Sequence, residues 1–97
     1  MTIQDIKKQI IPTLRRGGVL KASIFGSFAR GDYNKRSDVD LLVQFGDDQS
    51  LLDLVGLKFD LEEKLGRKVD ILTYRSIHPL LKEIIMREQK IIYEKRQ

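Results

Sequence analysis

Two aspartates separated by one valine stand at the start of the apolar segment VDLLVQF, residues 39–45, which predicts a buried strand. Because side chains alternate across a strand, Asp38 and Asp40 point to the same side, with their α-carbons about 7 Å apart. Two carboxylates at this spacing repel each other unless a cation lies between them. Since an all-oxygen ligand set favours a hard ion, the pair predicts a Mg²⁺ site; the alternative is a strand start that faces solvent.

A glycine and a serine follow the preceding β-branched segment, residues 19–25, and open the short helical stretch SFARG. Glycine lets a backbone approach a phosphate closely, and the N–H groups at a helix start can bind its oxygens together with a serine hydroxyl. We therefore expect Gly26 and Ser27 to bind phosphate. The alternative is a plain turn in which the serine caps the helix.

A third carboxylate, Asp70, lies between Val69 and Ile71 in the segment KVDILT, residues 68–73, which predicts another strand. An acid in this position is costly to bury unless it is paired or bound to a metal. If this strand lies beside the strand of Asp38, Asp70 completes a triad that suits two metal ions and a general base for an attacking hydroxyl. The alternative is an edge-strand aspartate that faces water.

The elements that position these residues follow from hydrophobic periodicity. Helices are expected at 3–15, 51–65 and about 78–89, and strands at 19–25, 39–45 and 68–73, with KIIYEK as a last strand or the end of the last helix. Pro12 should kink the first helix or start a second short turn. The second helix should bury one apolar stripe formed by Leu51, Leu54, Val55, Leu57, Leu61 and Leu65. This order predicts an α/β (α+β) fold in which helices pack on a small mixed sheet.

The composition predicts a single domain over residues 1–97, because a chain of this length with 41% hydrophobic residues can bury only one core. The lack of cysteine and the charged N-terminal segment favour a cytoplasmic protein without a signal peptide or membrane span. Because the net charge of +4 is scattered and tryptophan is absent, we do not expect nucleic acid as a partner. An uncovered sheet edge would permit a homo-oligomer.

The stretch GSFARGDYNKRSDVDLLV, in which GS and DVD are separated by ten residues, resembles the signature of the DNA polymerase beta-like nucleotidyltransferase superfamily. It is most similar to the minimal members, the MNT-domain proteins, many of which resemble antitoxins encoded beside a HEPN-domain toxin. The resemblance implies the nucleotidyltransferase fold. It also implies that Gly26 and Ser27 hold the nucleotide phosphates, that Asp38 and Asp40 bind Mg²⁺, with two ions expected, and that Asp70 is the third catalytic and metal-binding position.

The resemblance, which covers residues 19–73, further implies transfer of a nucleoside monophosphate, expected to be AMP from ATP, to a hydroxyl. Arg30 resembles a family position near the nucleotide and could contact triphosphate oxygens; the alternative is a structural pair with Asp32 or Asp38. Ser37 should brace the loop before the strand, and His78 is not expected to be catalytic.

The chain departs from larger relatives because it has no added helical domain that would bind the acceptor. A partner protein, expected to be the HEPN-domain toxin, must therefore present the hydroxyl, or activity has been lost. The alternative function is a non-catalytic antitoxin that neutralises its partner by complex formation. A third reading, transfer to RNA ends, is weaker because the sequence contains no recognisable RNA-binding domain.

Overall fold

The structure is a computed structural model that describes residues 1–95. In chain order its elements are α1 (Ile3–Arg16), β1 (Val19–Phe25), α2 (Gly26–Arg30), β2 (Val39–Phe45), α3 (Leu51–Leu65), β3 (Val69–Thr73), the 3-10 helix η1 (Tyr74–Ser76), α4 (Pro79–Glu88) and β4 (Lys90–Glu94). The predicted order of helices and strands is confirmed, and the segment KIIYEK forms a strand over Lys90–Glu94. Along residues 1–95, every helix falls short of the length and apolar character that a membrane crossing requires.

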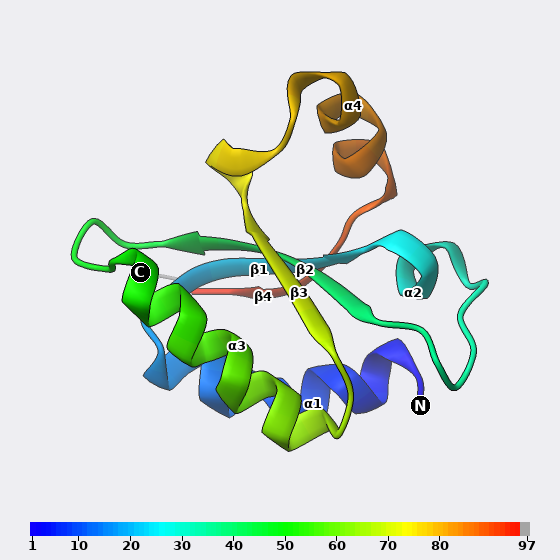
Figure 1. The fold of residues 1–97 in the computed structure, drawn as a ribbon, viewed down its shortest axis with the longest axis horizontal. Helices are drawn as coiled ribbons and strands as arrows, with labels where there is room; N and C mark the ends of the chain where they lie inside the picture. The colour runs from blue at the N-terminus through cyan, green and yellow to red at the C-terminus, as the bar shows by residue number, and fades with distance from the viewer. Residues whose placement is uncertain (96–97) are drawn as a thin grey trace.

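The four strands form one mixed sheet in the order β3-β2-β1-β4 (Figure 1). β1 is antiparallel to both β2 and β4, whereas β2 and β3 are parallel. The parallel pair needs a crossover connection, which α3 supplies. β2 therefore occupies a central position, which explains why its apolar residues continue without regular alternation.

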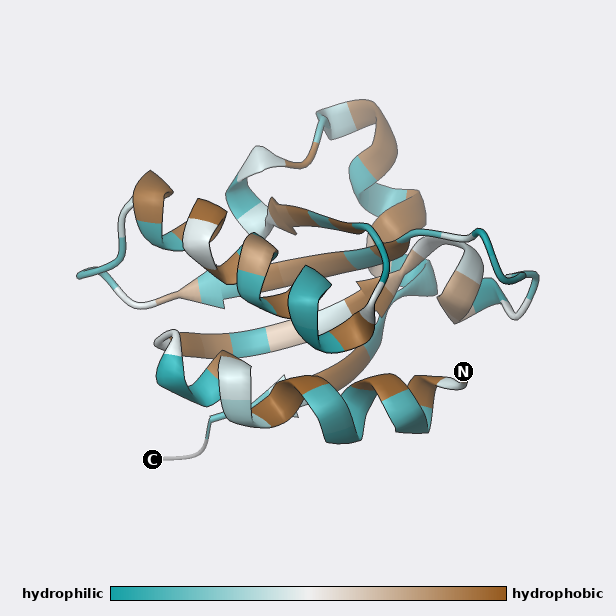
Figure 2. Ribbon diagram, turned by 60° about the horizontal axis from the view of Figure 1, so that its bottom comes forward, coloured by the Kyte–Doolittle hydropathy of each residue, from teal (hydrophilic) through white to brown (hydrophobic). Residues whose placement is uncertain are grey.

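Helices cover both faces of the sheet, and Figure 1 shows α1 and α3 on one side with α4 on the other. The larger core lies beneath α1 and α3, and Val39, Leu41 and Val43 of β2 point into it. A smaller cluster on the other face joins Leu42 of β2 to Ile85 of α4. Figure 2 shows that hydrophobic residues run along the strands between these layers. The fold is the predicted α/β domain.

α1 continues through Pro12, so the second short turn expected there does not form. Ile6 and Ile10 before the proline, and Leu14 after it, are all fully buried. Burial of each such side chain contributes about 1.5 to 3 kcal/mol, which together exceeds the cost of about 3 kcal/mol for a proline inside a helix. Packing against the sheet therefore keeps both halves of the segment in one helix.

The apolar stripe of α3 is narrower than the sequence predicted. Leu57, Leu61 and Leu65 are buried, but Leu51 is 74% exposed and Val55 is 43% exposed, so the prediction of core positions is wrong for these two residues. At about 100° per residue, Leu51 lies about 80° and Val55 about 120° around the helix from Leu61. Both side chains thus turn away from the row that faces the sheet.

Candidate active site

Asp40 and Asp70 are direct neighbours on the parallel strands β2 and β3. Asp40 faces the opposite side of the sheet from Val39 and Leu41, because side chains alternate along the strand. In-register residues of neighbouring strands share a face, so both carboxylates lie on the face that carries α4. The predicted adjacency of these two strands is confirmed.

Asp38 lies directly before β2, at the same end of the parallel strands. The Val39 N–H donates to the Lys68 carbonyl at 3.0 Å, which extends the pairing of β2 and β3 to this point. The Lys68 ammonium lies 4.0 Å from the Asp38 carboxylate; the lysine side chain is 62% exposed and the aspartate side chain 40%. The three carboxylates therefore gather at one end of the sheet, with Asp38 turned toward a lysine.

The surroundings of Asp40 disfavour its ionised form. Burial, followed by the charges of Asp70 and Asp38, raises the pKa of Asp40 to about 6, while the Arg30 charge acts in the opposite direction. Each cause that raises this pKa disfavours the ionised carboxylate. A bound cation would reverse the balance, because it would favour the charged form.

Gly26 brings the start of α2 against Asp40. Its φ of 71° lies in the left-handed region, and a Cβ built at this position would overlap the Asp40 carboxylate. Only glycine therefore meets both demands, the backbone conformation and the close approach. The N-cap of α2 is Phe25, and it makes no side-chain cap hydrogen bond. Ser27 lies inside the helix, so the alternative in which this serine caps a plain turn does not hold.

Arg30 ends α2 and carries two carboxylate contacts. Its Nε donates to Asp32 at 3.3 Å and its Nη1 donates to Glu88 of α4 at 3.3 Å. These contacts raise the pKa of Arg30, chiefly through the hydrogen bond and charge of Asp32. The pair with Asp32 is one of the two alternatives that the sequence left open. Asp38 contacts Lys68 instead.

The carboxylate oxygens at this end of the sheet are the ligand type that a hard divalent cation prefers. Within residues 1–95, no group of three His, Cys, Asp or Glu side chains is arranged so that it could hold a metal ion. Asp38, Asp40 and Asp70 nevertheless offer only carboxylate oxygens, which Mg²⁺ prefers, and burial together with the charges of Asp70 and Asp38 raises the pKa of Asp40. A metal ion would be held by these three residues, with Asp38 released from Lys68.

Sequence reasoning missed the residues that connect the site to neighbouring elements. Lys68 and Arg67 precede β3, and the Arg67 guanidinium donates to the Ser37 carbonyl at 3.1 Å while lying over the Phe28 ring. Glu88 reaches Arg30 across 58 positions of the sequence. No local pattern signals these contacts, since they depend on strand register and on where α4 packs.

Two other expectations concern residues beside the site. The Ser37 hydroxyl accepts a hydrogen bond from the Asn34 N–H at 2.8 Å, so this serine braces the loop before β2 as predicted. His78 is the N-cap of α4, and its Nδ1 accepts from the Leu80 N–H at 3.1 Å. A capping function accounts for this histidine without a catalytic role.

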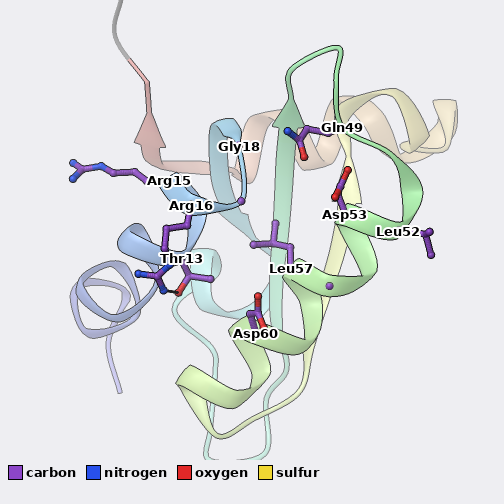
Figure 3. Close-up of a pocket in the computed structure, with 11 residues that line it drawn as sticks. Thr13, Arg15, Arg16, Gly18, Gln49, Leu52, Asp53, Leu57 and Asp60 are labelled. Atoms are coloured by element: carbon purple, nitrogen blue, oxygen red, sulfur yellow. Dashed lines mark hydrogen bonds between the residues drawn. The ribbon is translucent and has the colours of Figure 1, made fainter.

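A separate hollow of about 390 Å³ lies between the end of α1 and the start of α3. Figure 3 shows Thr13 and Arg16 on one side of it and Leu57 and Asp60 on the other. This hollow belongs to the face covered by α1 and α3, whereas Asp40 faces α4. The candidate site and the hollow therefore lie on opposite faces of the sheet.

Comparison with known proteins matches the chain to one family. The model of the family described as polymerase beta, nucleotidyltransferase, matches residues 8–97. A protein of Methanocaldococcus jannaschii, provisionally named a protein adenylyltransferase, is 59% identical over 88 residues, which cover 91% of this chain and 95% of the relative. The protein adenylyltransferase MntA of Thermococcus cleftensis is 38% identical over 73 residues, which cover 75% of this chain and 74% of MntA.

Solved structures agree with this match. A structure provisionally described as a minimal nucleotidyltransferase superposes with a TM-score of 0.80 at 36% identity, covering 93% of this chain and 95% of that one. A chain from the complex of a tri-AMPylated Shewanella oneidensis HEPN toxin with its MNT antitoxin gives a TM-score of 0.72 at 22% identity, covering 95% and 72%, and shows the shared fold alone. The chain therefore belongs to the polymerase beta nucleotidyltransferase family, as one of its minimal, MNT-type enzymes.

Proposed function

We propose that this protein transfers AMP from ATP to a hydroxyl group of a HEPN-domain partner protein in the presence of Mg²⁺. The observation that carries the proposal is the gathering of Asp38, Asp40 and Asp70 at one end of the sheet, with Gly26 packed directly against Asp40. The names of the relatives as protein adenylyltransferases support AMP as the transferred group. The description of a HEPN toxin as tri-AMPylated in a complex of this fold supports the partner class.

The residues at the start of α2 are assigned to the triphosphate. The backbone N–H groups of Gly26 and Ser27 and the Ser27 hydroxyl would donate to phosphate oxygens, because no side-chain cap occupies this helix start. The guanidinium of Arg30, at the other end of α2, would donate from its planar fork. These donors would orient the α-phosphate toward the carboxylates without moving the strands.

The carboxylates are assigned to the metal and to the acceptor proton. Asp38, Asp40 and Asp70 would hold divalent cations, which supply charge neutralisation for the phosphates when bound. Asp70, on the edge strand β3, would also accept the proton of the attacking hydroxyl. The acceptor oxygen then bonds to the α-phosphorus while the bond from that phosphorus to pyrophosphate breaks. Rigid strand ends suit this step because small displacements of the reacting groups slow it strongly.

The second candidate is a binding antitoxin without transfer activity. The observation in its favour is the apolar surface of α4, where Leu80 is 82% exposed and Leu81 and Ile84 are each 52% exposed. Exposed apolar side chains of this size favour contact with another protein. Residues 10–14 of α1 do not add to this surface, since Ile10 and Leu14 are fully buried in the core.

The test is the intact mass of a HEPN-domain protein encoded beside this chain, after incubation with the chain, Mg²⁺ and ATP. We expect an increment of one or more AMP units. Asp38→Asn with Asp40→Asn should abolish the increment, whereas Asp47→Asn with Asp48→Asn should retain it. The control pair removes the same charge from exposed positions in the turn after β2, at the far end of that strand.

The outcomes separate the two candidates. A stable complex without any mass increment would favour the binding antitoxin. An increment that persists at the native rate in the Asp38→Asn, Asp40→Asn variant would contradict the assignment of the carboxylates. Labelling of RNA in the absence of a protein partner would contradict the proposed acceptor class.

A further inference from the structure

Arg30 is held from two directions at the edge of the candidate site. Asp32, two residues on, binds its Nε, and Glu88 of α4 binds its Nη1. Two hydrogen bonds to different nitrogens of one guanidinium fix its plane, whereas one contact would leave it free to rotate. Nη2 forms no hydrogen bond with residues 1–95. Arg30 lies one turn of α2 after Gly26, whose backbone packs against Asp40, which places Arg30 at the edge of the candidate site.

The backbone that carries Glu88 is itself anchored to the sheet. Glu88 is the last residue of α4, and Gln89 follows as the C-cap, with its N–H donating to the Ile85 carbonyl at 2.9 Å. The Tyr74 hydroxyl donates to the Gln89 side chain at 3.0 Å and lies 2.8 Å from the Ser23 hydroxyl of β1. Ser23 is fully buried, so this chain of contacts reaches the core of the sheet.

Glu88 is also the better shielded partner of Arg30. Its side chain is 27% exposed, compared with 62% for Asp32 and 47% for Arg30. A partly buried, anchored carboxylate restrains a guanidinium more strongly than an exposed one, because solvent screens it less. The contact across 58 positions also joins α4 to α2, whereas the contact with Asp32 is local.

We propose that Glu88 is a positioning residue for nucleotide binding: it holds the Arg30 guanidinium at the edge of the candidate site with Nη2 available to a phosphate oxygen. The inference rests on the proposed function, because it assumes that Arg30 binds the triphosphate. Glu88 itself would not touch the nucleotide. Its contribution would act through the orientation of Arg30 alone.

The two possible roles of Glu88, as a nearby charge and as a positioning residue, predict opposite changes in nucleotide affinity when its charge is removed. If the carboxylate acts only as a nearby negative charge, its neutralisation removes repulsion and strengthens the binding of an anionic triphosphate. If the carboxylate positions Arg30, its neutralisation frees the guanidinium and weakens binding. The direction of the change in affinity therefore separates the two roles.

The experiment is calorimetric titration of the full chain with AMP-PNP and Mg²⁺, which measures binding without transfer. We expect Glu88→Gln to raise the Kd about tenfold, because hydrogen bonds to charged groups contribute about 1.5 to 3 kcal/mol and this variant retains part of the contact. Glu83→Gln is the matched control, since it neutralises the partner of Arg87 in the same helix, in a pair at 2.6 Å between two highly exposed side chains. The control should bind as the unaltered chain does.

A double-mutant cycle with Arg30→Ala tests whether Glu88 works through Arg30. We expect Arg30→Ala alone and Arg30→Ala with Glu88→Gln to bind AMP-PNP equally. The inference would be overturned if Glu88→Gln bound AMP-PNP as tightly as Glu83→Gln or more tightly. It would also be overturned if Glu88→Gln weakened binding by the same factor in the Arg30→Ala variant as in the unaltered chain. If the unaltered chain does not bind AMP-PNP, the proposed function fails and this inference fails with it.

Discussion

Asp40 has two negatively charged neighbours, Asp70 and Asp38, and the backbone of Gly26 packs directly against its carboxylate. Its pKa of about 6 exceeds the ordinary value of 3.8 because burial and the charges of Asp70 and Asp38 disfavour ionisation. The folded state therefore binds a proton more tightly than the unfolded state does. The contribution of this proton to the free energy of unfolding is fully present below about pH 4 and is lost as the pH rises through 6.

At the residue scale, Asp40→Asn should stabilise the metal-free protein at pH 7. One pKa unit corresponds to about 1.4 kcal/mol, and solvent screens a half-buried group, so we expect a gain of about 1 kcal/mol in the free energy of unfolding. The gain should vanish near pH 4, where the native carboxyl is already protonated. Urea unfolding at both pH values measures it, with Asp48→Asn as the exposed control. A variant less stable than the unaltered chain at pH 7 would contradict this electrostatic account.

Gly26 and Gly31 allow the close approach to Asp40 to be separated from backbone strain. Both have positive φ, of 71° and 82°, but a Cβ would overlap Asp40 only at Gly26, and nothing lies within 4 Å of one at Gly31. Substitution by alanine at either position should lower the free energy of unfolding by about 1 kcal/mol, because of the positive φ. At Gly26 the overlap with Asp40 should lower it by about 1 to 3 kcal/mol more. Thermal unfolding compares the variants, and equal losses would show that the contact with Asp40 is unimportant.

At the element scale, α4 owes its position to a hydrogen-bonded chain as much as to apolar packing. Ile85 is its one buried residue, whereas the Tyr74 hydroxyl connects Gln89 at the end of α4 to buried Ser23 of β1. Loss of that hydroxyl would leave Ser23 without its partner, which costs about 1 to 3 kcal/mol. This chain of contacts also fixes the backbone from which Glu88 reaches Arg30.

Tyr74→Phe should therefore loosen α4 selectively. We expect amide hydrogen exchange in residues 79–88 to accelerate while α1 keeps its protection, because α1 is held by the separate core under the sheet. Tyr33→Phe serves as the control, since the Tyr33 ring stacks on Phe28 at 4.3 Å and its packing does not require the hydroxyl. Unchanged exchange in α4 would contradict the anchoring role of Tyr74.

Periodicity in the sequence predicted the elements well and their contacts only in part. The pattern placed Asp40 and Asp70 on strands and Asp38 directly before one, and the parallel pairing of β2 and β3 brought them together. Strand register and helix packing depend on distant contacts, so Lys68 beside Asp38 and Glu88 beside Arg30 left no local signal. Amphipathic spacing likewise predicted a wider buried stripe on α3 than packing uses.

At the scale of the whole molecule, the site occupies one end of a rigid sheet and one of its two faces. The parallel ends of β2 and β3 supply carboxylates, the start of α2 carries the N–H groups that we propose bind phosphate, and α4 closes one side through Glu88. The hollow between α1 and α3 lies on the other face and takes no part in this arrangement. A homo-oligomer through an uncovered sheet edge stays a prediction.

The most direct test of the central claim is a crystal structure of the chain with Mn²⁺ and AMP-PNP, in which anomalous scattering locates the metal. We predict an anomalous peak for a manganese ion bound by the carboxylates of Asp38 and Asp40, with the triphosphate bound at Gly26 and Ser27. Metal and nucleotide bound together elsewhere, such as in the hollow beside Thr13, would contradict the assignment of the catalytic centre.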